Sequence, residues 1–248
     1  MRQVFAVFKR ELGLYFRSPV AYAIAFALML FFGLFFSSSL SSANGQSPAD
    51  SVNFIPNLLT FLLFLVAPLL TMRLLAEETR EGTLEVLMTL PIRESQFILG
   101  KFMAVWAYYT IILLLTAVYH IILTTVGVPD AGRAFGMYLG AWLYGGATLA
   151  VTMIWSAVTE DQVVAAFLGA ATVLVLYLAE VAATAISNLP NVPPTVGSFI
   201  RELGLQAHYE TTLLQGVIRA EDILYFVFMI IGALFITTRI VEVRRWRS

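Results

Sequence analysis

Six long apolar runs dominate this chain of 248 residues and limit what it can fold into. An α-helix needs about 20 mostly apolar residues to cross a bilayer, and each run approaches or exceeds that length. The chain is 59% hydrophobic and only 12% charged, whereas a soluble domain carries about 25% charged residues. We therefore expect an all-α polytopic membrane protein, with one transmembrane domain over residues 1–248. Its six transmembrane helices are expected at residues 20–40, 54–76, 97–126, 135–158, 163–186 and 223–239.

Lys and Arg are distributed unevenly between the two ends of these runs. The chain has fifteen Lys and Arg residues. Twelve lie on the same side of the predicted spans as the two chain termini, and the other side holds only Arg133, Arg201 and Arg219. Cytoplasmic loops carry the excess of Lys and Arg in membrane proteins. The pattern predicts that both termini and residues 77–96 are cytoplasmic.

Residues 1–18 have the pattern of an amphipathic helix at the membrane interface. Pro19 breaks this helix before the first span. A simple basic anchor that fixes orientation is a compatible interpretation. The candidate membrane-interface residues are Phe5, Phe8, Leu12 and Phe16 on the apolar face, with Lys9 and Arg10 beside it.

The segment 77–96 is charged, and lipid cannot accommodate it. Glu77, Glu81 and Glu85 would form a repelling acidic stripe on one continuous helix. We expect Gly82 to break that helix and Thr83 to cap a short new one ending before residue 91. A solvated acidic loop would explain the glutamates, but not the shared apolar face of Leu84, Leu87 and Met88. A docking helix explains both.

Two further stretches suggest local packing. Residues 187–221 contain Pro190, Pro193 and Pro194 and apolar clusters too short to span, which indicates short external helices between spans five and six. Gly132, Gly136 and Gly140 line one face of the fourth span and allow close helix approach. Packing within the subunit is favoured over a dimer seam.

No catalytic, cofactor-binding or metal-binding constellation is visible. Gly100 and Lys101 are followed by Phe102 and lack the glycine pattern of a phosphate-binding loop. Both histidines stand without metal-ligand spacing, and the chain has no cysteine. No basic patch with interleaved aromatic residues points to nucleic acid. The carboxylate of Glu180 falls inside a predicted span, near its end, where we expect it to reach water rather than serve transport.

The residues 76–93 (AEETREGTLEVLMTLPIR) and 99–102 (LGKF) resemble the signature of the ABC type-2 permeases, and most closely the gliding-motility-type permease subunit. Residues 10–19 (RELGLYFRSP), 159–165 (TEDQVVA), 208–226 and 244–247 (RRWR) extend the similarity over nearly the whole chain.

The resemblance implies the permease subunit of an exporter in the bacterial plasma membrane. It implies a homo- or heterodimer with a second permease subunit, and cytoplasmic ABC ATPase subunits that hold the ATP and Mg. Residues 83–90 would then be the coupling helix, and residues 159–162 a smaller second contact. The residues expected to bind the ATPase are Glu77, Glu78, Arg80, Glu81, Gly82, Thr83, Leu84, Glu85, Leu87, Met88, Thr89, Pro91, Glu160 and Asp161.

Two other classes of function stay open at this point. A stand-alone secondary transporter or channel would favour ionisable groups at mid-membrane and broken helices, and the spans are predicted to have few of either. A membrane anchor that recruits an ATPase for mechanical signalling would share every feature described above. The sequence does not identify a substrate.

Overall fold

The computed structural model describes residues 2–42, 54–82, 93–127, 129–189 and 192–245. These residues form helices and connecting turns without any strand, which confirms the predicted all-α class. The helices are α1 (Arg2–Tyr15), α2 (Pro19–Ser42), α4 (Phe54–Thr71), α5 (Arg73–Arg80), α7 (Glu94–Val126), α8 (Ala131–Val158), α9 (Gln162–Tyr177), α10 (Ala179–Ser187), α11 (Pro194–Leu203), α12 (Ala207–Glu210), the 3-10 turn η1 (Leu213–Gln215) and α13 (Ala220–Arg245).

The six predicted spans correspond to helices of the structure. Five helical segments in the described part of the chain are long and apolar enough to cross a membrane, and α9 with α10 makes a sixth if they count as one span. These two helices meet at an angle of 45° around Leu178. The fifth predicted span is therefore bent, which the sequence did not indicate, and Glu180 lies in the first turn after the bend.

The helix α8 is the centre of the bundle, and more of it is buried than of any other candidate span. Its small residues let neighbouring side chains come close. The rings of Tyr109 and Trp106 from α7 occupy the space that a Cβ would fill at Gly145 and Gly146. The Tyr109 hydroxyl donates to the Ala141 carbonyl at 2.7 Å, so its polar end is satisfied inside the core.

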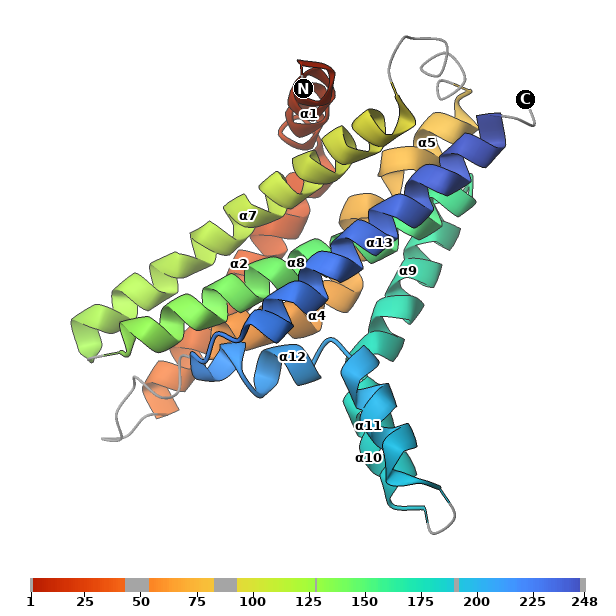
Figure 1. Cartoon of the computed structure of the whole chain (residues 1–248). Helices are drawn as coiled ribbons and strands as arrows, with labels where there is room; N and C mark the ends of the chain where they lie inside the picture. Colours follow the sequence, from red (N-terminus) through yellow and green to blue (C-terminus); the bar gives the residue numbers. More distant parts are fainter. Residues whose placement is uncertain (1, 43–53, 83–92, 128, 190–191, 246–248) are drawn as a thin grey trace.

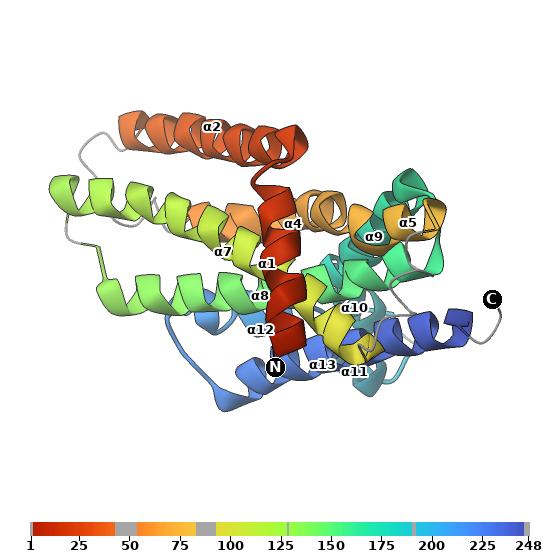
Figure 2. The ribbon, with the colours of Figure 1, turned by 90° about the horizontal axis from the view of Figure 1, so that it is seen from above.

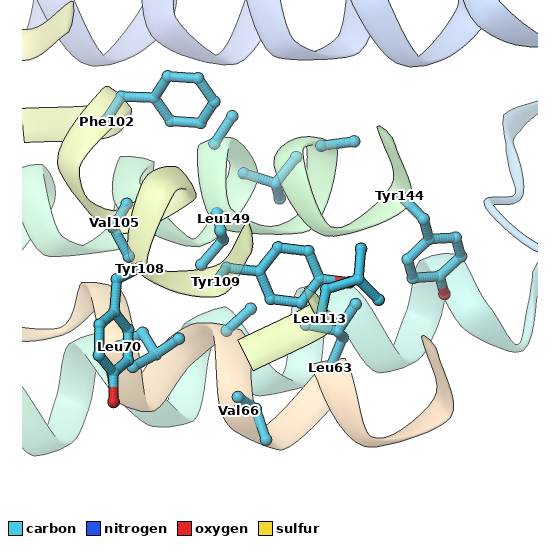
Figure 3. Packing of buried hydrophobic residues seen from close by; sticks show 14 of the residues in the cluster. Leu63, Val66, Leu70, Phe102, Val105, Tyr108, Tyr109, Leu113, Tyr144 and Leu149 are labelled. Atoms are coloured by element: carbon cyan, nitrogen blue, oxygen red, sulfur yellow. The ribbon is translucent and has the colours of Figure 1, made fainter. Parts of the chain in front are cut away.

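Apolar side chains from α4 and α7 pack against this central helix. Figure 3 shows Leu63, Val66 and Leu70 of α4 below Tyr109 and Leu113 of α7. All five are buried, and they belong to one continuous core cluster with residues of α8. Burial of a large apolar side chain contributes about 1.5–3 kcal/mol. The contact fixes α4 and α7 on α8.

The helix α1 lies across the end of α7 rather than along the bundle (Figure 2). Pro19 opens the next helix, as the sequence predicts. The Tyr15 hydroxyl donates to the Leu70 carbonyl at 2.6 Å, and its ring stacks on Tyr108 with centroids 5.0 Å apart. These contacts hold the amphipathic helix against the rest of the protein.

The short helices between the last two spans gather at the end of the bundle away from the N- and C-termini (Figure 1). There α12 and η1 pack against α8, because two of its glycines leave room for them. A Cβ at Gly136 would lie 2.8 Å from Gly216 Cα, and a Cβ at Gly140 would lie 2.8 Å from Leu213 Cβ. The segment is therefore an integral part of the bundle and not a loose loop.

Candidate functional site

Four charged side chains from three helices meet where α1 crosses α7. The Lys101 ammonium of α7 lies 3.1 Å from Glu11 of α1 and 2.9 Å from Glu78 of α5. The Arg10 guanidinium contacts the same two carboxylates, at 2.5 and 2.9 Å. We call these four residues the charge cluster. Two cations and two anions make it neutral, and it joins three helices that are distant in sequence.

The charge cluster is buried at its centre and open at its rim. The exposed fractions of the side chains are 2% for Lys101, 6% for Glu11, 16% for Glu78 and 44% for Arg10. The Lys101 ammonium also lies 5.0 Å from the centre of the Phe97 ring. Removing one member of a buried pair leaves an unpaired charge, which costs far more than the intact pair contributes. The cluster therefore fixes geometry more than it adds stability.

Local sequence explains how α1 reaches this position. Val7 and Glu11 are four residues apart, so they lie on the same face of the helix, and both are buried. Gly100 allows the close approach, since a Cβ there would lie only 2.8 Å from Val7 Cβ. Lys101 follows immediately and meets Glu11. Gly100 thus brings α1 close enough to α7 for Glu11 to pair with Lys101.

The start of α5 is held by a residue of α8. Met72 stands at the N-cap position and provides no side-chain hydrogen bond. Instead the Ser156 hydroxyl accepts from the backbone N–H groups of Leu75 and Ala76 at 3.0 and 3.2 Å, and donates to the Met72 carbonyl at 3.0 Å. Free N–H groups at a helix start need such partners. Ser156 therefore caps α5 from a different helix.

The charge cluster lies on both sides of residues 83–92, which are outside the described residues. Before that segment, α5 ends at Arg80, close to the break expected at Gly82, and Gly82 has a left-handed φ of +69°. After it, α7 begins at Glu94. Glu78 and Lys101 thus connect the two helices from which the segment emerges.

A family model described as ABC-2 family transporter protein matches residues 39–200 of the chain, which is more than half of it. The chain belongs to this family. No curated protein matches it. The assignment makes the chain a multi-pass membrane component of an ABC-2 transporter. Such components are typically non-catalytic and generally pair with an ABC ATPase.

For an ABC-2 membrane component, the predicted ATPase contacts are of first interest. Arg80, Glu81 and Gly82 are exposed, and Glu77 is half-buried. Glu78 belongs to the charge cluster, so it pairs with Arg10 and Lys101 inside the subunit. The other members of the central set, namely Thr83, Leu84, Glu85, Leu87, Met88, Thr89 and Pro91, lie outside the described residues.

The predicted second contact lies at the turn between α8 and α9. The Asp161 carboxylate accepts from the N–H groups of Val163 and Val164 at 2.7 and 3.1 Å, so it caps α9. Glu160 is exposed beside it. The Arg244 side chain donates to the Val158 carbonyl at 2.6 Å, which ties the last helix to this turn.

The membrane-interface set divides between two roles. Phe5, Lys9 and Phe16 are exposed, and Phe8 and Leu12 are half-buried. Arg10 is also exposed, but its guanidinium pairs with the charge cluster.

Of the three predicted helix-packing glycines, Gly136 and Gly140 have a neighbouring element packed on them, and Gly132 does not. Gly136 and Gly140 receive α12 and η1, as described above. Near a Cβ at Gly132 the closest atom is the carboxylate of Asp130, which caps the same helix.

Sequence reasoning missed three residues that hold this site together: Glu11, Lys101 and Ser156. A signal for the first two was present. Glu11 follows Val7 by one helical turn on the packed face of α1, and Lys101 interrupts an apolar run. A charge in such a place needs a partner. Ser156 gave no signal, because a serine near a helix end is common.

Proposed function

We propose that the chain is the transmembrane permease subunit of an ABC type-2 exporter of the gliding-motility type. It moves substrate across the membrane with ATP that a separate ATPase subunit binds with Mg and hydrolyses. The observation that carries this proposal is the ion pair between the buried Lys101 and the half-buried Glu78. It joins the helices on either side of residues 83–92, so a displacement of that segment is delivered to α5 and α7 together.

The ATPase docks on residues 77–96, with residues 83–90 as the coupling helix and Glu160 at the rim of a second contact. Three features support this assignment. Arg80, Glu81 and Gly82 are exposed where the chain leaves α5. The start of α5 is bonded to α8 through Ser156. The charge cluster ties the same region to α1.

The test replaces the apolar anchor of the coupling helix. Leu87→Asp should leave the permease inserted and dimeric, yet weaken ATPase binding or uncouple hydrolysis from transport, because the ATPase groove loses its central contact. Gly82→Val should act similarly, since a β-branched residue resists a positive φ. The control is Leu189→Asp, an exposed leucine two residues after α10, a helix that lies at the other end of the bundle (Figure 1).

The measurements are pull-down of the ATPase and hydrolysis in reconstituted membranes. If Leu87→Asp binds and couples like the parent protein, residues 83–90 are not the coupling helix.

The permease lies in the bacterial plasma membrane, paired with a second permease subunit, with both termini in the cytoplasm. Because the chain has no cysteine, single cysteines report topology cleanly. An impermeant thiol reagent added to intact cells should label Asn188→Cys and leave Ser95→Cys unlabelled. Both positions are exposed in the subunit, so the reverse pattern would invert the orientation.

A further inference from the structure

Three buried polar atoms without hydrogen-bond partners lie near the bend between α9 and α10. They are the hydroxyls of Tyr144 and Tyr209 and the side-chain oxygen of Gln206, and within the described ranges none has a partner. Tyr144 and Tyr209 are fully buried and Gln206 is 4% exposed. An unsatisfied buried polar atom costs about 1–3 kcal/mol. Three together indicate a site that something else completes.

Two carboxylates border these atoms. The Gln206 side-chain nitrogen donates to Glu210 at 2.6 Å. Burial raises the pKa of Glu210, and the nearby charge of Glu180 raises it further. Among the residues with described positions, neither carboxylate forms an ion pair with Lys or Arg. The site therefore has negative charge without a cation.

Aromatic rings complete the surroundings. The rings of Tyr144 and Tyr209 meet edge to face with centroids 5.8 Å apart, and Glu210 follows Tyr209 directly on α12. Tyr177 comes from the last turn of α9. Aromatic rings next to carboxylates attract cations, because the face of each ring carries partial negative charge. Glu180 and Glu210 are half-buried, whereas the two tyrosines are fully buried.

We propose that Tyr144, Gln206, Tyr209, Glu210 and Glu180 form a binding site for a primary ammonium group. Such a group has three N–H donors, and the site offers acceptors: an amide oxygen, two carboxylates and two phenol oxygens. A quaternary ammonium would leave the amide oxygen unsatisfied. The inference rests on the proposed function in one respect, since in a permease this group would belong to the transported molecule or to a lipid headgroup.

The experiment uses the purified permease without ATPase, in nanodiscs of phosphatidylglycerol. Binding of radiolabelled ethanolamine is measured and competed with ethylene glycol, glycolate and choline. Ethanolamine should compete about tenfold better than each of the others, because only it combines positive charge with N–H donors. Nanodiscs that contain phosphatidylethanolamine then identify the source. Reduced binding of free ethanolamine there assigns the site to the lipid headgroup, and unchanged binding assigns it to a soluble amine.

Variants locate the bound group. Glu210→Gln keeps the shape of the side chain and should lower ethanolamine affinity about tenfold, as expected for loss of a charged hydrogen bond. Glu180→Gln should lower the ethanolamine affinity several-fold. Because Glu180 is half-buried and lies on another helix, this variant tests the site even if Glu210→Gln disturbs the fold. The matched control Glu221→Gln, an exposed acid at the start of α13, should bind as the parent does.

Equal competition by ethylene glycol, absence of ethanolamine binding, or full affinity in both Glu210→Gln and Glu180→Gln would overturn the site. Each result is independent of the proposed function, because no ATPase is present in the assay. Conversely, failure of the Leu87→Asp experiment would leave the ethanolamine result intact.

Discussion

Lys101 and Glu78 form an ion pair of 2.9 Å although residues 83–92 separate their helices in the sequence. The pair links the two helices that flank that segment in the sequence, α5 and α7. A closed connection resists independent movement of α5 and α7, and the shared partners Arg10 and Glu11 add α1 to the same unit. A force applied to the segment therefore acts on three helices at once.

Lys101→Met should destabilise the permease by about 3 kcal/mol, because Glu11 and Glu78 lose their buried cation. Adding Glu78→Gln should restore most of the stability, since Arg10 and Glu11 then remain as a neutral pair. Unfolding in detergent, followed by intrinsic fluorescence, measures both effects. Arg239→Met is the control: it breaks an exposed pair with Glu242 and should cost about 0–1 kcal/mol. A loss for Lys101→Met no larger than that of the control would contradict the cluster's role.

Ser156→Ala should loosen the start of α5 by about 1 kcal/mol, the usual effect of losing a helix cap. Amide hydrogen exchange should become faster at Leu75 and Ala76, whose N–H groups lose their acceptor. Thr148→Val is the matched control, because the buried Thr148 hydroxyl bonds only carbonyls of its own helix. Unchanged exchange in Ser156→Ala would show that α8 does not hold α5.

Gly140→Ala should destabilise the fold by about 1–3 kcal/mol through overpacking, since the added methyl group would lie 2.8 Å from Leu213 and 2.9 Å from the Tyr209 ring. Gly232→Ala provides the contrast. It also lies within a helix, but no atom outside its own helix backbone and chain neighbours lies within 4 Å of the added carbon, so this change should be neutral or stabilising. Thermal unfolding of the two variants compares them directly. Equal melting temperatures would mean that α12 and η1 do not seat on α8 as described.

Ethanolamine binding should weaken as the pH falls below neutrality. The pKa of Glu210 is raised by burial and by Glu180, so Glu210 takes up a proton at a higher pH than an ordinary carboxyl. The neutral acid attracts ammonium less, whereas the amine itself stays charged. The phenols of Tyr144, Tyr177 and Tyr209 stay neutral in this range, because a tyrosine ordinarily titrates near pH 10. Affinity measured from pH 7 to pH 4 should therefore fall in the parent and stay flatter in Glu210→Gln.

The spans were predictable because long apolar runs have few alternatives in a membrane protein. The breaks at Pro19 and Gly82 were predictable for a similar reason, since each residue restricts or permits particular backbone angles. These features are local in the sequence. The bend at Leu178 was not predicted, because no proline or glycine marks it.

The contacts of the site were harder to foresee. Glu78 looked like one more acid in a charged segment, and only the fold shows that it faces Lys101 and Arg10. The unpaired atoms of Tyr144 and Gln206 are likewise visible only in three dimensions. Partner choice between helices depends on how they cross, and spacing along the chain does not specify that.

The capping of α5 by Ser156 has a mechanical consequence. Ser156 and Gly136 are twenty residues apart on α8, which is about 30 Å along a continuous helix. One end of this rod is bonded to α5, and the other supports η1 and α12. A tilt of α8 that starts at the end bonded to α5 therefore also moves its other end, where η1 and α12 pack.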